Sequence, residues 1–370
     1  MIQKLFILIS VLGIFSSCMK HKDKNYDVYM AVGTYTQKES EGVYLLKLNT
    51  ETGESLFVDT LEVENPSYLT ISSTQDKMYI VTESNDMMRD AVHQVAIDKE
   101  KGKLQLEHSI LTQGAAPCYV LEIPSSHKVV TANYMSGSIS VFTQDDNNNL
   151  VDLVEIIPFF GNGPIKERQG QSHLHCVYLS PDDHYLFAND LGSDKIYRFN
   201  LDSVGLGLSD VCFPLKPGAG PRHTVFHPNQ KWAYTITELS GEVVAYKYQD
   251  GILHEFQSII ADSLQVQGSG DIQISPNGKF LYASNRLAGD GVAIFRVDPK
   301  TGGLERIGYQ FTGKHPRNIN ITPNGKYLVV ACRDEDSIEF YEIDYKTGRL
   351  LPTPFSINIS MPVCIKFFSN

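Results

Sequence analysis

The stretch that decides the fold is "YLSPDDHYLFAND", residues 178–190, in which two apolar segments flank a polar turn at Pro181. Tyr, Leu and Phe favour strands and the Pro-Asp-Asp run favours a turn, so the stretch predicts two short strands joined by a tight turn. The pattern recurs as "FHPNQKWAYTITE" (226–238), "QISPNGKFLYASN" (273–285) and "NITPNGKYLVVAC" (320–332). The four turn prolines (Pro181, Pro228, Pro276 and Pro323) are 47 or 48 residues apart. A repeat of this length is typical of propellers and solenoids.

Counting the copies predicts how many units the chain contains. Two weaker copies lie upstream, "YLTISSTQDKMYIVTE" (68–83) and "YVLEIPSSHKVVTAN" (119–133), which makes six units with a strand-turn-strand core. The N-terminal "YDVYMAVGTYT" and "EGVYLLKLN" supply second and third strands without a first, and the C-terminal "MPVCIKFF" supplies only a first. The sequence therefore predicts an all-β, seven-bladed β-propeller with four antiparallel strands per blade. The N- and C-terminal strands together close the last blade, so that no open sheet edge remains.

The N-terminus reads as a targeting segment. "MIQK" is a short basic start, the following apolar run "LFILISVLGIF" is too short for a stable membrane span, and small residues precede Cys18. We expect residues 1–17 to be a signal peptide, residues 18–26 to be a lipidated Cys18 and a polar tether, and residues 27–370 to be a single propeller domain. An ordinary cleaved signal peptide that happens to end near a cysteine is the alternative. The lipoprotein interpretation predicts that the protein is located in the bacterial cell envelope and is attached to the membrane by the lipid on Cys18.

Charge and cysteine content exclude several classes of protein. The formal charge of −11 argues against binding a nucleic-acid backbone. Apart from Cys18, the odd number of five cysteines shows no C-x-x-C spacing, which signals neither a disulfide framework nor a zinc site. Four of them, Cys118, Cys176, Cys332 and Cys364, lie in or beside apolar strand patterns and are expected to be buried. No cofactor is indicated.

The register of the repeat predicts a ring of side chains at one mouth of the central channel. The first strand of each blade lines the channel, so equivalent positions on first strands should meet at the same height. Six residues before the turn prolines stand His175, Arg222, Gly270 and Arg317, and ten residues after them stand Leu191, Glu238, Arg286 and Arg333. His173 lies two residues before His175, so on an extended strand both imidazoles should face one cavity.

These residue types fit an anionic, oxygen-rich ligand, because guanidinium groups match carboxylate and phosphate geometry. We expect His173, His175, Arg222, Glu238 and Arg286 to be catalytic, and Arg317, Arg333 and Asn133 to bind substrate. For Arg317 and Arg333, pairing with a neighbouring blade is an equal alternative. Capping of a tight bend would explain Asn133 equally well. The two histidines lack a third ligand at matched spacing, so no metal is expected.

Several of these motifs carry a resemblance to a known family. "VGTYT", "GVYLLKLN", "ANYMSGSISVF", "HLHCVYLSPDDHYLFANDLGSDKIY", "GAGPRHTVFHPNQKWAYTITELSGEV", "ISPNGKFLYASNR" and "HPRNINITPNGKYLVVA" resemble the lactonase family of seven-bladed propellers. That family includes propeller-type 6-phosphogluconolactonases and carboxy-cis,cis-muconate cyclases. By motif, the resemblance implies site residues at His173 or His175, Arg222, Glu238 and Arg286. The sequence departs from the family at Cys332-Arg333, where an Asn-Gln pair is usual.

The resemblance implies hydrolysis of a lactone, which needs a water nucleophile, a base and a stabiliser for the tetrahedral oxyanion. A histidine would activate the water, Arg222 and Arg286 would hold the anionic group of the substrate and the developing charge, and Glu238 would orient the base or shuttle a proton. The expected substrate is a small anionic, sugar-derived or acidic lactone or sugar acid in the cell envelope, because a phosphorylated cytoplasmic intermediate is a poor substrate for an exported enzyme. A lactonising isomerase of the muconate-cyclase type and a non-catalytic propeller that binds a glycan or a protein are the alternatives.

Overall fold

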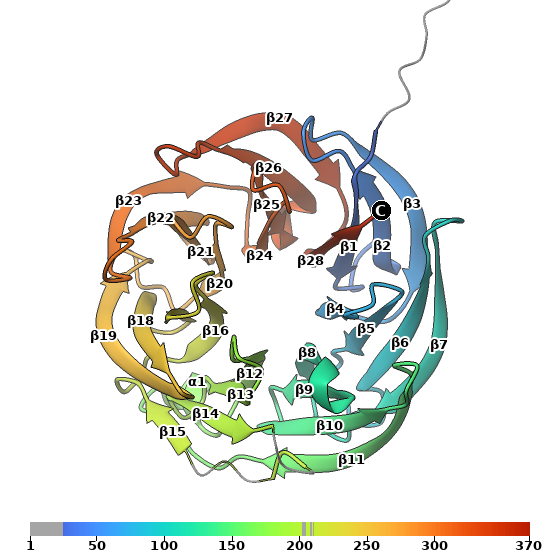
Figure 1. Ribbon diagram of the computed structural model, residues 1–370, viewed down its shortest axis with the longest axis horizontal. Coiled ribbons are helices and arrows are strands. Elements are labelled where there is room, and N and C mark those ends of the chain that lie inside the picture. The colour runs from blue at the N-terminus through green and yellow to red at the C-terminus, as the bar shows by residue number, and fades with distance from the viewer. Residues whose placement is uncertain (1–24, 202–204, 208, 210) are drawn as a thin grey trace, which may run out of the picture.

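Seven four-stranded antiparallel sheets stand around a central channel in the computed structural model (Figure 1), which describes residues 25–201, 205–207, 209 and 211–370. The strands of the closing blade are, in spatial order, β28 (Pro362–Ser369), β1 (Val28–Thr34), β2 (Gly42–Leu48) and β3 (Ser55–Glu62). The next blade consists of β4 (Leu69–Ile71), β5 (Lys77–Thr82), β6 (Ala91–Asp98) and β7 (Lys103–Leu111). It is followed by β8 (Pro117–Ile123), β9 (Lys128–Asn133), β10 (Ser138–Gln144) and β11 (Leu150–Pro158).

Four further blades complete the ring. The first of them consists of β12 (Leu174–Leu179), β13 (Tyr185–Asp190), β14 (Lys195–Asn200) and β15 (Val211–Pro214), and the second of β16 (Pro221–Phe226), β17 (Trp232–Thr237), β18 (Glu242–Gln249) and β19 (Ile252–Ile260). The third consists of β20 (Ser269–Ile274), β21 (Phe280–Asn285), β22 (Gly291–Val297) and β23 (Leu304–Phe311). The fourth consists of β24 (Pro316–Ile321), β25 (Tyr327–Cys332), β26 (Ser337–Ile343) and β27 (Leu350–Asn358). The described part of the chain also contains three short helical turns, η1 (Pro124–Ser126), α1 (Lys166–Gln169) and η2 (Arg333–Glu335). Among the described residues, no helix is long and apolar enough to cross a membrane.

The two ends of the chain close the ring as the sequence predicts. Strand β1 pairs with β28 antiparallel, from Val28 opposite Ser369 to Gly33 opposite Cys364, and β2 continues the sheet on the other side of β1. Strand β28 lies innermost in its blade, next to the channel (Figure 1). The predicted fold, all-β with seven four-stranded blades, is confirmed.

The turn after each first strand holds the repeat in register. Its third residue adopts a left-handed backbone in all four clear copies, with φ values between 57° and 75° at Asp183, Gln230, Gly278 and Gly325. Glycine adopts this conformation without strain, which explains the Pro-Asn-Gly-Lys sequence of the last two copies. The tight turn lets first and second strands pair directly, and the second strands are almost entirely buried between neighbouring blades.

Candidate active site

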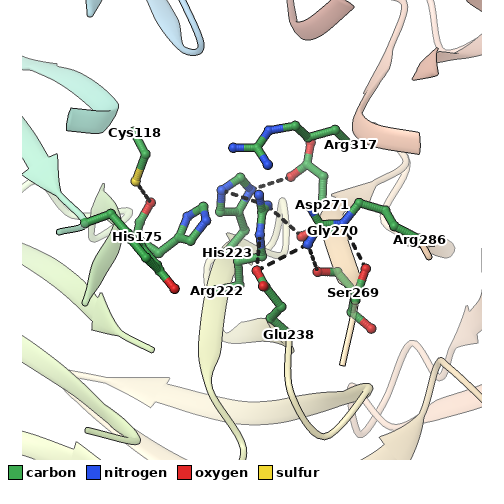
Figure 2. Close-up of polar contacts among 12 residues, drawn as sticks. Cys118, His175, Arg222, His223, Glu238, Ser269, Gly270, Asp271, Arg286 and Arg317 are labelled. Carbon is green, nitrogen blue, oxygen red and sulfur yellow. Dashed lines mark hydrogen bonds and ion pairs between the residues drawn. The ribbon is translucent and has the colours of Figure 1, made fainter. Parts of the chain in front are cut away.

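A cavity of about 220 Å³ opens at one mouth of the channel. Most of its lining is polar or charged, and it contains three guanidinium groups and two carboxylates. The residues that line it are Tyr35, Glu83, Cys118, Tyr134, Arg168, His175, Glu238, Arg286 and Arg317. Figure 2 shows part of this group, with His175 and Arg286 on opposite sides of Arg222 and His223, and with Glu238 beneath them in this view.

A repeated β-bulge on the innermost strands sends three of these side chains into the cavity. The register between first and second strands shifts at Cys118, His175, Arg222 and Arg317, each of which is the extra residue between two paired neighbours. A bulge of this kind bends the strand and re-aims one side chain, and bulges are common next to active sites. The position six residues before the turn proline is therefore a bulge position in the blades of β12, β16 and β24.

The residues that follow second strands form the other layer of the cavity wall. Five of the seven blades contribute their residue at this position, namely Tyr35 after β1, Glu83 after β5, Tyr134 after β9, Glu238 after β17 and Arg286 after β21. All five strands end at the same mouth of the channel. Residues at equivalent positions of different blades therefore lie side by side around that mouth.

Glu238 forms ion pairs with three arginines on one side of the cavity. Its Oε2 accepts a hydrogen bond from Arg222 Nε at 2.8 Å and lies 3.3 Å from Arg286 NH2, and its Oε1 pairs with Arg168. Burial alone would raise the pKa of this carboxyl, but Arg286, Arg222 and Arg168 outweigh burial and hold it at about 2. Glu238 is therefore ionised at neutral pH and serves to hold three guanidinium groups in place.

Arg286 is fixed by backbone carbonyls as well as by Glu238. Its Nε donates to Gly268 O at 2.8 Å and its NH2 donates to Ser269 O at 3.1 Å, while NH1 lies 3.3 Å from His315 Nε2. Burial lowers the pKa of Arg286 to about 9 despite the nearby Glu238, so the group remains charged at neutral pH. Such a rigid, buried cation can stabilise negative charge without reorganising.

Arg222 lies deeper in the channel than the cavity wall, and only 2 % of its surface is exposed. Besides Glu238, its NH1 donates to Gly270 O at 2.9 Å and to His223 Nε2 at 3.2 Å. Arginine only donates, so His223 Nε2 must accept, and the proton of this neutral ring sits on Nδ1, which donates to Asp271 Oδ1 at 2.7 Å. Burial and the adjacent Arg222 lower the pKa of His223 to about 4. The hydrogen-bonded pair of His223 and Asp271 thus helps to hold the Arg222 guanidinium in place.

His175 presents a neutral imidazole to the cavity. Its ring meets those of His223 and Tyr134 edge-on, with centroids 5.1 and 5.7 Å away, and its Nδ1 is buried without a hydrogen-bond partner among the described residues. Burial, followed by electrostatic interactions with Arg222, His223 and Arg317, lowers the pKa of His175 well below 6.5. Hydrogen-bonding capacity therefore remains available on this ring for a ligand.

His173 does not share the cavity with His175, contrary to the expectation from the spacing. Its ring stacks on Tyr134 with centroids 4.4 Å apart, and its Nδ1 lies 2.8 Å from Tyr134 O, the geometry of an N–H donating to a carbonyl. The physical reason is the bulge at His175, which breaks the alternation that an ideal strand would impose. His173 buttresses Tyr134, which is itself part of the cavity wall.

The three expected substrate-binding residues have different surroundings. Arg317 lines the cavity and donates to Tyr35 Oη at 2.8 Å. Arg333 forms a two-pronged ion pair with its neighbour Asp334 and is not part of the cavity wall. Asn133 is fully buried at the end of β9, where its Nδ2 donates to Ser138 Oγ and Ser140 Oγ, as the capping alternative predicts.

Sequence reasoning missed five residues of the cavity wall. Tyr35, Glu83, Tyr134 and Cys118 occupy the same register positions as the predicted residues, but in the weaker upstream copies and in the closing blade, where the register was not applied. The fifth, Arg168, comes from α1 in an insertion between β11 and β12 that has no counterpart in the repeat. Only folding brings it to Glu238.

No group of three or more His, Cys, Asp and Glu side chains among the described residues is placed to hold a metal ion. The five cysteines of the described part are unpaired, and Cys118, Cys176, Cys332 and Cys364 are buried as the strand pattern predicts. The cavity wall offers guanidinium, carboxylate, imidazole, phenol and thiol groups, which suit acid–base reactions of a small oxygen-rich molecule. Fold and cavity together describe a seven-bladed propeller with a polar cavity at one end of its channel.

Comparison with known proteins identifies the family. The model of the family described as Lactonase, 7-bladed beta-propeller, matches residues 29–367. A 6-phosphogluconolactonase of Formosa agariphila is 36% identical over 92% of this chain and 99% of its own length, and one of Bacillus subtilis is 35% identical over 91% and 97%. The chain belongs to this lactonase family of seven-bladed β-propellers, whose reaction is that of a carboxylic ester hydrolase.

Solved structures agree with this assignment. A Bacteroides fragilis structure superposes with a TM-score of 0.89 at 46% identity, covering 94% of this chain and 99% of that chain. The periplasmic gluconolactonase of Pseudomonas aeruginosa superposes with a TM-score of 0.86 at 27% identity, covering 93% and 99%. The match extends over the whole propeller and is not confined to a few blades.

Proposed function

We propose that this protein hydrolyses a small sugar-derived or acidic lactone in the cavity at the channel mouth. The observation that carries the proposal is the buried cluster around Glu238, where three guanidinium groups are held beside a neutral imidazole in a space sized for a small molecule. Attack of water on the lactone carbonyl creates a negative oxygen, and fixed cations in a site with little water stabilise such charge strongly.

In this proposal Arg286 and Arg168, which line the cavity, face the carbonyl oxygen on which negative charge develops. Arg222 lies behind them and keeps Glu238 in place. Glu238 remains a carboxylate and acts as a clamp on the guanidinium groups, because a group with a pKa of about 2 is a weak proton acceptor at neutral pH.

Of the two histidines in the H-x-H motif, His175 is the one that we expect to contact the substrate. Its neutral ring can donate one hydrogen bond and accept another, which suits a substrate hydroxyl or carbonyl. Taking up the proton of the attacking water beside Arg222 and Arg317 would cost free energy, since burial and both of these charges already lower its pKa well below 6.5. We therefore assign His175 to binding and orienting the lactone.

We further propose that the enzyme works in the cell envelope, anchored through Cys18. Residues 1–24, which include the expected signal peptide and Cys18, lie outside the described part of the chain. The sequence pattern of this segment and the periplasmic relative support the proposal. Strand β1 runs from Val28 to Thr34 and delivers Tyr35 to the cavity, so the chain enters the propeller at the opposite face.

The test is to incubate the purified protein with glucono-δ-lactone, 6-phosphogluconolactone and a galactonolactone and to follow acid release with a pH indicator. We expect hydrolysis of at least one lactone well above the spontaneous rate. The double variant His175→Ala, Arg286→Lys should lose it, while Arg296→Lys, which alters an exposed arginine paired with Glu305, should behave like the wild type. Absence of turnover across the panel with a folded protein would contradict the proposal.

A further inference from the structure

The cavity holds a second carboxylate, Glu83, whose surroundings differ from those of Glu238. Glu83 follows β5 and Glu238 follows β17, at equivalent positions three blades apart, so the two carboxylates approach the channel from opposite sides. Glu238 contacts three arginines, whereas Glu83 makes no ion pair with any described residue. Two carboxylates in one site with unlike environments are typical of a division of labour in acid–base catalysis.

A tyrosine and an arginine fix the orientation of Glu83. Arg317 NH2 donates to Tyr35 Oη at 2.8 Å, and the guanidinium carbon lies 5.2 Å from the centroid of the Tyr35 ring. Since arginine only donates, the phenol proton points the other way, to Glu83 Oε2 at 3.1 Å. A carboxylate accepts hydrogen bonds through both oxygens, so Oε1 remains available for a water molecule.

We propose that Glu83 is the general base that activates the hydrolytic water, with Tyr35 and Arg317 as its positioning residues. The inference rests on the proposed lactonase function and names the proton acceptor that this function requires. Water held between Glu83 and the lactone would approach the carbonyl carbon from the side opposite Arg286 and Arg168, the two cations that face the carbonyl oxygen.

In the proposed step, Glu83 accepts a proton from water and later returns it to the ring oxygen of the lactone. As the water oxygen bonds to the carbonyl carbon, one water proton moves to Glu83 and the carbonyl oxygen becomes negative beside Arg286. When the intermediate collapses, the bond between the carbonyl carbon and the ring oxygen breaks, and Glu83 returns the proton to that ring oxygen, which becomes a hydroxyl. The product acid then loses its own proton to solvent, and Glu83 is again a carboxylate.

Three titratable or charged groups face Glu83 from neighbouring elements. They are Tyr35 after β1, Cys118 of β8 and Arg317 of β24. Burial raises the pKa of the Tyr35 phenol and of the Cys118 thiol, so both stay protonated through the neutral range and neither competes for the proton of water. Arg317 is the one cation of the three; its charge attracts Glu83 directly, and its hydrogen bond to Tyr35 holds the phenol that donates to Glu83.

The test compares Glu83→Gln and Glu83→Ala with the wild type on glucono-δ-lactone, or on whichever lactone of the panel the wild type hydrolyses best. We expect kcat to fall about 100-fold to 10,000-fold in Glu83→Gln, the range for loss of a general base, with a smaller change in KM. The low-pH limb of the kcat/KM profile should disappear as well. Added formate or acetate should restore part of the activity of Glu83→Ala, which loss of a structural contact would not allow.

The matched control is Glu64→Gln, the same chemical change at an exposed ion pair with Arg89 outside the cavity, which should leave the kinetics unchanged. Tyr35→Phe removes the hydrogen bond to Glu83 and should lower kcat less than Glu83→Gln does while shifting the low-pH limb. A folded Glu83→Gln variant that keeps wild-type kcat and its low-pH limb would overturn the inference and leave the lactonase proposal standing. A wild type without lactonase activity would instead overturn the function itself.

Discussion

Replacing Glu238 with glutamine should destabilise the protein by an amount that follows from its surroundings. In the folded protein Arg286, Arg222 and Arg168 overcome the effect of burial and lower the Glu238 pKa from 4.5 to about 2. At about 1.4 kcal/mol for each pKa unit, this difference corresponds to roughly 3 kcal/mol of folding free energy at pH 7. The range is the one expected when a buried charge pair loses one partner.

The pH dependence gives this prediction a second, independent signature. A carboxyl whose pKa is lowered by folding stabilises the protein fully above its unfolded pKa, and the stabilisation is lost as pH falls through the folded pKa. For Glu238 this window extends from 4.5 down to about 2, so the difference between wild type and Glu238→Gln should shrink across it. By about pH 3, roughly 2 kcal/mol of the difference should be gone.

Thermal and urea denaturation, followed by circular dichroism at several pH values, would measure both effects. With an unfolding entropy of about 2.1 cal/mol/K per residue, 3 kcal/mol corresponds to a Tm about 4 °C lower for a chain of 370 residues. Glu305→Gln, at an exposed pair with Arg296, should change stability by less than about 0.5 kcal/mol. If Glu238→Gln is as stable as this control at pH 7, or if its deficit does not shrink at low pH, the clamp role assigned to Glu238 is wrong.

Three further predictions follow from the cavity and from the closure of the ring. Steady-state kinetics should show that His175→Ala loses about 100-fold in kcat/KM, whereas His173→Ala stays within a few-fold of wild type and is mainly less stable. Arg286→Lys should lose at least about 100-fold in kcat/KM, because an ammonium cannot reproduce the fork that binds two carbonyls and the oxyanion, and the loss of these buried hydrogen bonds should also lower its stability. Deletion of residues 362–370 removes β28 and leaves β1 as an open edge, so size-exclusion chromatography should show aggregates and no folded monomer.

Repetition made most of the fold predictable. A period of 47 or 48 residues, a turn proline in each clear copy and half-units at the two ends were enough to give seven four-stranded blades and the shared closing blade. In every blade except the closing one, strand pairing is local along the chain, so the sequence pattern records it directly. The same register placed His175, Arg222, Glu238, Arg286 and Arg317 around one end of the channel.

Predictions made from the repeat register failed where the structure departs from an ideal strand or from the repeat. An alternating strand would turn His173 and His175 the same way, but a bulge separates them, and bulges depend on pairing with the neighbouring strand. Arg168 arrives from an insertion without a repeat counterpart and still pairs with Glu238, 70 residues away in sequence. The local sequence around Arg168 and around Glu238 does not predict that the two side chains form an ion pair.

By itself, then, the sequence determined the architecture, its closure and the end of the channel at which chemistry-bearing residues gather, because these follow from periodic local patterns. Tertiary structure alone decided which of those residues meet and in what ionic state. Glu238 is held ionised by three arginines from separate segments, His175 is held neutral by burial and by charges from other blades, and Tyr35 meets Arg317 across 282 residues of chain. Coulomb interactions and desolvation act through space, and the spatial neighbours of a side chain exist only once the ring has closed.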